Sequence, residues 1–147
     1  MSESPAKGVF KTAPLAELLE SVGVSKSSVI RVTGPSSLSA LVWFCRHGFE
    51  QVGYVRPGEG CLHEEPDAII VAHTCNELDL KRLLSVGRQV RPGGVFIFQF
   101  RSAADGSLLG VDWLLQQAGF TAEQRLERGR GTLIAARRRT VAFRKAA

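Results

Sequence analysis

Two apolar runs, joined by one helix and one tight turn, constrain the fold of this chain more than any other feature of its sequence. The first run, 67–73, is almost continuously apolar, which is typical of a central parallel strand covered on both faces. A helix is predicted over 76–90, and the turn at 91–94 leads straight into the second run, 95–100. The apolar residues predicted for the inner side of this helix are Leu80, Leu83, Leu84 and Val86. Two strands with a crossover helix between them predict an α/β fold with a parallel sheet.

The rest of the chain continues the alternation of helices and strands. Further helices are predicted over 14–22, from a capping Ser36 or Ser37 to His47–Gly48, and over 108–118. Further strands are predicted over 29–32, 49–55, 121–128 and 132–137, the last two joined as a hairpin by Gly129-Arg130-Gly131. The sequence therefore predicts a Rossmann-like sheet that is mostly parallel and ends in an antiparallel C-terminal hairpin.

Length and composition fit a single domain. A chain of 147 residues with 44% hydrophobic residues is long enough to bury one core. We predict a flexible N-terminus over 1–13, the folded domain over 14–139, and a basic tail or the start of a linker over 140–147. No apolar run approaches the roughly 20 residues of a membrane span. Three widely spaced cysteines without a CxxC pair predict neither a disulfide framework nor a metal site, so we expect a cytoplasmic protein.

The net charge of +5 is unevenly distributed. Between Arg125 and Ala147, eight Lys/Arg against one acid give +7, whereas eleven against thirteen in residues 1–124 give −2. This pattern favours a solvated basic tail, and contact of Arg125–Lys145 with an acidic partner or nucleic acid is the alternative. Phe143 is the only ring in the tail, so base stacking is not supported and nucleic-acid binding is not expected.

The central segment resembles class I S-adenosylmethionine-dependent methyltransferases. Pro66-Asp67-Ala68-Ile69-Ile70-Val71 is similar to the "fDxI" strand of that family, and Val90-Arg91-Pro92-Gly93-Gly94-Val95-Phe96-Ile97 to its "L-x-P-G-G" turn and next strand. The ending, Ala118-Gly119-Phe120 and the hairpin into Leu133–Arg137, is similar as well. The resemblance covers roughly residues 29–138. It implies a methyltransferase-type fold and, in an active member, S-adenosylmethionine as the cofactor.

The cofactor half of the chain departs from that family. A nucleoside-binding loop after the first strand needs several glycines, but the loop 32–38 has only Gly34, followed by Pro35. The second strand ends at Arg56, a cation where an acidic residue should accept the ribose hydroxyls. Glu50 and Glu59 are nearby in sequence but are poor substitutes.

The spacing of the segments predicts a further loss. Only eleven residues, 56–66, separate the second strand from Asp67, and this is too short for a crossover helix and another strand. The third strand is therefore predicted to be missing, and no cofactor is expected to bind. A vestigial pocket would consist of Thr33, Gly34, Pro35, His73 and Thr74.

These departures give a narrower resemblance, to the N-terminal domain of the anamorsin family of cytosolic iron–sulfur cluster assembly proteins. Ser36-Ser37 is similar to the Ser-Ser loop of that family, and 88–94 to its "RILRPGG" turn. The resemblance implies a non-catalytic interaction domain with a protein partner, a diflavin reductase, while the clusters lie in a cysteine-rich segment that this chain lacks. The alternative is an S-adenosylmethionine-dependent methyltransferase of unknown substrate. The oligomeric state stays open.

Two groups of residues have side chains suited to chemistry. His73-Thr74-Cys75-Asn76-Glu77 follows the central strand and could activate a thiolate, but helix capping by Thr74 or Asn76 and packing of Cys75 are the simpler interpretation, which we favour. Consecutive residues such as 63–65 (His-Glu-Glu) cannot all face one metal ion. We therefore predict no catalytic and no metal-binding residues. Cys45 is predicted to pack in the core, and Trp43 and Trp113 to pack in the core or at an interface.

Overall fold

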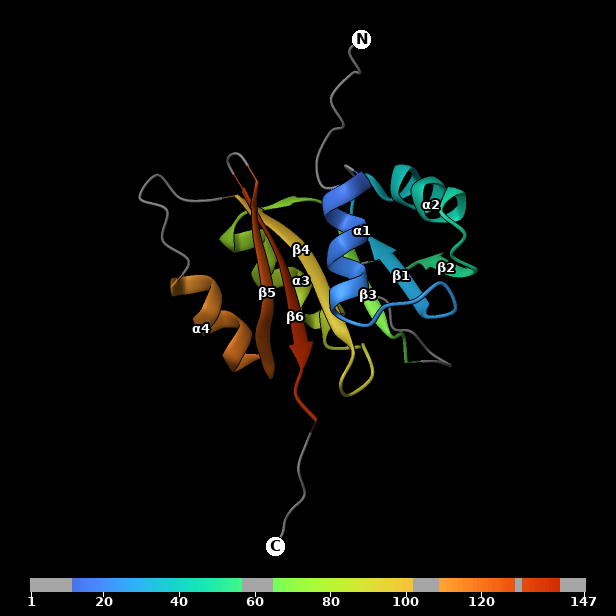
Figure 1. Ribbon diagram of the computed structural model, residues 1–147. Helices are drawn as coiled ribbons and strands as arrows, with labels where there is room; N and C mark the ends of the chain where they lie inside the picture. Colours follow the sequence, from blue (N-terminus) through green and yellow to red (C-terminus); the bar gives the residue numbers. More distant parts are fainter. Residues whose placement is uncertain (1–11, 57–64, 102–108, 129–130, 141–147) are drawn as a thin grey trace, which may run out of the picture.

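The structure is a computed structural model that describes residues 12–56, 65–101, 109–128 and 131–140 (Figure 1). The helices are α1 (Thr12–Ser21), α2 (Ser37–Arg46), α3 (Glu77–Gly87) and α4 (Leu109–Gln117). The strands are β1 (Val29–Thr33), β2 (Gln51–Tyr54), β3 (Ala68–Cys75), β4 (Val95–Arg101), β5 (Phe120–Arg128) and β6 (Gly131–Arg138).

The six strands form one sheet in the order β2-β1-β3-β4-β6-β5. Strands β1 to β4 run parallel, and β6 lies antiparallel between β4 and β5. This confirms the predicted mostly parallel sheet with an antiparallel C-terminal hairpin. After β1 the chain adds β2 on one side and β3 on the other, so the strand order reverses between β1 and β3. In open α/β sheets such a switch point opens a crevice at the carboxyl ends of the strands.

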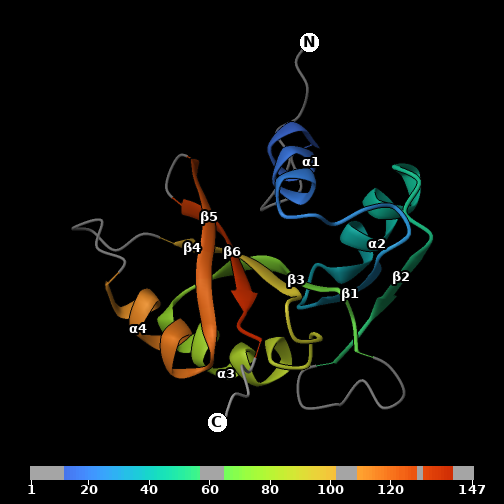
Figure 2. The same cartoon turned by 60° about the horizontal axis from the view of Figure 1, so that its bottom comes forward.

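Helices cover both faces of the sheet, α1 and α2 on one and α3 and α4 on the other (Figure 2). Successive residues of a strand point to opposite faces. Ile70 of β3 accordingly packs with α1 and α2, and its neighbour Ile69 packs with α3 and α4. Both faces of the central strands are buried, which explains why these strands are apolar at almost every position.

Strand β2 lies at one edge of the sheet. Within the described residues its only strand neighbour is β1, with Val29 to Val32 paired to Gln51 to Tyr54. This agrees with the prediction that the third strand of the family is missing. Residues 57–64, including Glu59, lie outside the described part of the chain.

Some boundaries differ from the predictions. Helix α3 ends at Gly87 instead of Val90, because the backbone N–H groups of Gln89 and Val90 donate to carbonyls three residues back, in turns tighter than an α-helix. Strand β3 extends two residues beyond His73, to Cys75. The predicted inner side of α3 is confirmed, since Leu80, Leu83, Leu84 and Val86 are all buried.

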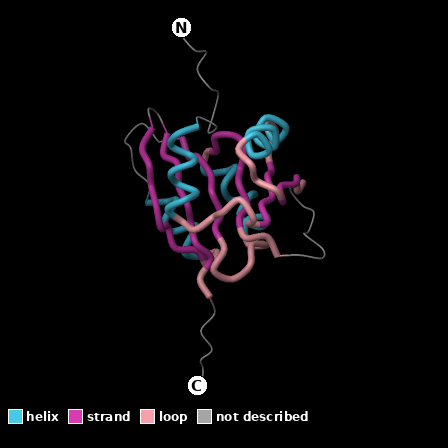
Figure 3. Tube along the Cα trace, turned by 45° about the vertical axis from the view of Figure 1, so that its right-hand side comes forward, coloured by secondary structure: helices cyan, strands magenta, loops and turns pink. Residues whose placement is uncertain are grey.

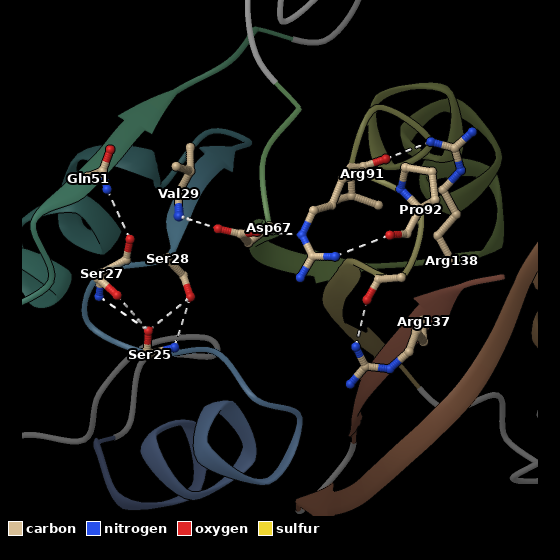
Figure 4. A network of polar contacts seen from close by, with 12 residues as sticks. Ser25, Ser27, Ser28, Val29, Gln51, Asp67, Arg91, Pro92, Arg137 and Arg138 are labelled. Carbon is tan, nitrogen blue, oxygen red and sulfur yellow. Dashed lines mark hydrogen bonds and ion pairs between the residues drawn. The ribbon is translucent and has the colours of Figure 1, made fainter. Parts of the chain in front are cut away.

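Hydrogen bonds from side chains tie the loops together along the amino edge of the sheet, the lower edge in Figure 3. Asp67 accepts a bond from the backbone N–H of Val29 at 2.8 Å and one from Nε of Arg91 at 2.5 Å (Figure 4). Nε2 of Gln51 donates to the carbonyl of Ser27 at 2.9 Å. The starts of β1, β2 and β3 are thus fixed to one another and to the turn before β4.

Arginines at the end of β6 bond to backbone carbonyls of other segments. Arg137 donates to the carbonyls of Gly93 at 2.7 Å and Val22 at 2.8 Å, and Arg138 donates to that of Val90 at 2.6 Å. Arg139 donates to the carbonyls of Phe120 and Gln116. These cations thus bind carbonyls that follow α1 and α3, one in the Pro-Gly-Gly turn, one near the end of α4 and one at the start of β5.

Candidate functional site

The loop between β1 and α2 lies at the switch point, where open α/β sheets commonly bind ligands. Gly34 has φ +105°, a conformation that side chains disfavour. The hydroxyl of Ser37 donates to the carbonyl of Gly34 at 2.6 Å and holds the turn. Ser36 occupies the position before α2 but makes no side-chain capping bond, so the prediction that Ser36 or Ser37 caps this helix is wrong. The Ser37 hydroxyl stabilises the loop instead.

His73 of β3 packs against this loop. A Cβ atom built on Gly34 would lie 2.6 Å from Nδ1 of His73, so the imidazole ring lies directly against the glycine backbone. Both the backbone conformation and the space therefore require glycine at this position. The structure brings together three of the five residues of the predicted pocket: Thr33, Gly34 and His73. Pro35 follows in the same loop and is exposed, and the side chain of Thr74 lies outside the described part of the structure.

Two polar atoms at this end of the sheet are buried without a hydrogen-bond partner in the described structure: Oγ1 of Thr33 and Nδ1 of His73. Thr33 is fully buried, and His73 is partly buried. Buried polar side chains are nearly always hydrogen-bonded to protein, water or ligand. The two atoms lie near the carboxyl ends of adjacent strands, at the switch point of the sheet.

The end of β2 offers a cation to this edge of the sheet. Val55 is buried and donates its N–H to the carbonyl of Val32 at 2.9 Å, which leaves the next residue, Arg56, exposed. Glu50 precedes β2 and donates its N–H to the carbonyl of Lys26 at the opposite edge, so it cannot replace the missing acid.

At the junction of β3 and α3, Asn76 caps the helix and Cys75 packs in the core, as the simpler interpretation predicts. Oδ1 of Asn76 accepts a bond from the N–H of Asp79 at 2.8 Å, and Oδ2 of Asp79 accepts one from the N–H of Asn76 at 3.2 Å. This is a reciprocal capping box at the start of α3. Cys75 is fully buried, and burial, with a smaller contribution from the Asp79 carboxylate, raises the pKa of its thiol to about 12. The thiol stays protonated at neutral pH and is no nucleophile.

The structure confirms some of the packing predictions for the tryptophans and Cys45 and contradicts others. Trp43 is buried as predicted, with 8% of its surface exposed. Cys45 is exposed, so the prediction that it packs in the core is wrong. Trp113 is 61% exposed and does not pack in the core, and packing at an interface stays a prediction. Within the described residues, no cluster of three or more His, Cys, Asp or Glu could hold a metal ion. His63 and Glu64 lie outside the described part, and Glu65 is exposed.

The basic C-terminal segment is largely built into the fold. Arg125 pairs with Asp112, and Arg137 pairs with Glu123 at 2.6 Å in addition to its carbonyl contacts. The prediction of a solvated tail falls on residues 141–147, which lie outside the described part.

Comparison with known proteins identifies the fold. No protein-family model matches the chain, and no curated protein sequence matches it. Among solved structures, ribosomal protein L11 methylase from Lactobacillus delbrueckii subsp. bulgaricus matches with a TM-score of 0.67 and 15% identity, over 90% of this chain and 80% of that chain. An S-adenosylmethionine-dependent methyltransferase from Mesorhizobium loti matches with a TM-score of 0.60 and 14% identity, over 86% and 99%. A methyltransferase from Pyrococcus furiosus matches with 0.56 and 14%, over 95% and 88%.

The chain therefore has the α/β fold of the class I methyltransferases. At 11–16% identity these similarities define the fold alone. They do not bear on the narrower resemblance to the anamorsin family. Among the described residues, none of the helices has the length and apolar character needed to cross a membrane.

Proposed function

We propose that this chain binds S-adenosylmethionine in the crevice between β1 and β3 and uses it for methyl transfer to a substrate still to be identified. The observation that carries the proposal is the pair of buried, unpartnered polar atoms, Oγ1 of Thr33 and Nδ1 of His73. The fold supports it, since solved structures with this fold include an S-adenosylmethionine-dependent methyltransferase.

The residues present fit part of such a ligand. The hydroxyl of Thr33 can both donate and accept a hydrogen bond, and Nδ1 of His73 can do either according to its tautomer. S-Adenosylmethionine, when bound, supplies a methyl group activated by its sulfonium. The buried thiol of Cys75 stays protonated and does not compete for that methyl group. Arg56 offers no carboxylate for the ribose hydroxyls, so we expect weaker binding than in enzymes with an acid there.

The test is calorimetric titration of the purified chain and of Thr33→Val with S-adenosylmethionine and S-adenosylhomocysteine. Because the hydroxyl of Thr33 has no partner in the described structure, valine should leave the free energy of unfolding unchanged or slightly raise it. The same change should weaken ligand binding about tenfold, because the hydroxyl loses its bond to the ligand.

Thr132→Val is the matched control. Thr132 is also a buried threonine, but it lies on β6, which β3 and β4 separate from β1 in the sheet. Saturable binding that Thr33→Val weakens and Thr132→Val does not would support the proposal. Absence of binding up to millimolar ligand, or equal effects of the two variants, would contradict it.

A second candidate is a non-catalytic interaction domain of the anamorsin type, cytoplasmic, with a diflavin reductase as its protein partner. The exposed cation at Arg56 and the single glycine of the β1–α2 loop favour it, because both disfavour a nucleoside ligand. Leu38 is 76% exposed and could contribute to a docking surface on α2. Binding of a purified diflavin reductase that Leu38→Asp weakens, in a chain that ignores S-adenosylmethionine, would favour this candidate.

A further inference from the structure

A cavity of about 590 Å³ lies between α1 and the C-terminal half of α2. Its walls include Leu19 of α1, Val24 of the following loop, and the rings of Trp43, His47 and Phe49. This volume lies within the range of roughly 300–1,000 Å³ that is typical of small-molecule sites. The cavity is thus large enough to hold a ligand.

The cavity lies far from the crevice of the proposed S-adenosylmethionine site. Its loop residues come before β1 begins, whereas Thr33 ends that strand. The two ends of a five-residue strand are roughly 13 Å apart. The inference from this cavity therefore stands independently of the proposed function.

Aromatic rings form one wall of the cavity. The rings of Trp43 and His47 stack with centroids 4.1 Å apart and planes 21° apart. Phe49 lies nearly parallel to Trp43 at 6.3 Å, and Phe44 holds Trp43 from the edge at 5.0 Å. A rigid set of nearly parallel rings favours a flat aromatic ligand, which can stack on it or meet it edge-on.

His47 adds a directional polar group. Its Nδ1 lies 2.7 Å from the carbonyl oxygen of Trp43, and because that oxygen can only accept, Nδ1 carries the hydrogen. In the neutral ring, Nε2 is then an acceptor. A ligand that places an N–H or O–H group at Nε2 gains a hydrogen bond.

Opposite charges flank the cavity. Glu20 of α1 and Lys26 of the following loop are both exposed lining residues, and the Lys26 side chain lies along Gly48. One carboxylate and one ammonium group leave no net charge, so the lining favours neither an anion nor a cation. We propose that the cavity binds a neutral, flat aromatic molecule that donates one hydrogen bond to His47.

Indole and 1-methylindole are the matched probes. They have the same ring system, but only indole has an N–H donor. In ¹⁵N-edited NMR spectra of the full chain, indole should shift the side-chain signals of Trp43 and His47 saturably. The signal of Trp113 is an internal reference, because Trp113 lies on α4, at the other face of the sheet. Loss of the single hydrogen bond should make 1-methylindole bind about fivefold more weakly.

Two substitutions on α1 separate occupancy of the cavity from effects on the helix. Ala16 lines the cavity, and Glu17 is its exposed neighbour outside the lining. Ala16→Trp should fill the space and abolish the indole shifts, whereas Glu17→Trp should leave them unchanged.

Three outcomes would overturn the proposal. The first is no saturable shift at Trp43 up to millimolar indole, or a parallel drift of Trp43 and Trp113. The second is equal affinity for indole and 1-methylindole, which would remove the hydrogen bond to His47. The third is binding of indole only after deletion of residues 2–11, which would indicate that the chain's own N-terminal segment occupies the cavity.

Discussion

The two edges of the sheet differ in whether their polar side chains have hydrogen-bond partners. At the amino edge, Asp67, Arg91 and Arg137 bond to backbone groups and to one another. At the carboxyl edge, Thr33 and His73 have buried polar atoms without a partner in the described structure. Unsatisfied buried polar atoms cost stability, so a chain gains from them only where something else binds. The amino edge thus stabilises the fold, and the carboxyl edge is where we propose that a ligand binds.

Loss of Asp67 should give the largest effect on the stabilising edge. Asp67→Ala removes the acceptor for the N–H of Val29 and the partner of Arg91, and it should lower the free energy of unfolding by about 2–3 kcal/mol. Urea unfolding followed by circular dichroism measures this. Glu65→Ala removes the same charge from an exposed neighbour and should change the free energy little. Equal effects of the two variants would show that the network at the amino edge is not stabilising.

Loss of the Arg137 contacts should give the second-largest decrease in the free energy of unfolding. Arg137→Met keeps the apolar stem but removes the bonds to Gly93, Val22 and Glu123. The free energy of unfolding should fall by about 1–2 kcal/mol. This is less than for a fully buried group, because a third of the side chain is exposed and solvent screens its ion pair. Arg88→Met, an exposed arginine at the end of α3, is the control for charge in the same unfolding experiment. If Arg88→Met lowers the free energy of unfolding as much, then the loss of a positive charge explains the effect of Arg137→Met and the carbonyl contacts do not.

Two helix starts at the carboxyl edge offer a comparison of their own. Asn76→Ala breaks the capping box of α3 and should cost about 1 kcal/mol. Ser36→Ala removes a side chain that makes no capping bond and should leave the free energy of unfolding unchanged. Thermal unfolding of the two variants in parallel tests this. A clear destabilisation by Ser36→Ala would reveal a role for its hydroxyl within the folded chain.

The smallest expected effect is a pH dependence at Asp67. Burial raises the pKa of this carboxyl, but the hydrogen bond from Arg91, the bond from the N–H of Val29 and the charge of Arg91 together lower it below its usual value of 3.8. A lowered pKa in the folded state adds stability that is complete above pH 3.8 and is lost as the pH falls through the lowered value. Asp67→Asn should lose this acid-dependent part of the unfolding curve. If the stability of Asp67→Asn falls at low pH as much as that of the unchanged chain, other carboxyls cause the acid dependence.

The sequence predicted the order of elements well because local patterns determined it. The continuous apolar runs of β3 and β4, the buried stripe of α3 and the C-terminal hairpin all follow from residues close together in the chain. The prediction that Cys45 packs in the core was wrong because the apolar residues of α2 surround the helix. Periodicity could not distinguish the buried Phe44 from the exposed Leu38 and Cys45.

The sequence predicted which residues form the candidate site, but not whether their polar atoms have hydrogen-bond partners. The crevice depends on Gly34 meeting His73, which lies 39 positions later and comes alongside only through the pairing of β1 with β3. Whether Thr33 or His73 finds a partner depends on such distant contacts and has no local signal. The carbonyl contacts of Arg137 to Arg139 were missed for the same reason, and their charge was interpreted as a tail.

The position of β6 has a consequence for synthesis of the chain. The last strand in sequence is not at the edge of the sheet but pairs with β4 on one side and β5 on the other. While the ribosome still holds that strand, β4 has no neighbour on one side and β5 has no partner. The nascent domain therefore exposes an open apolar sheet edge until translation of β6 is complete, and this interval is when a chaperone would be needed most.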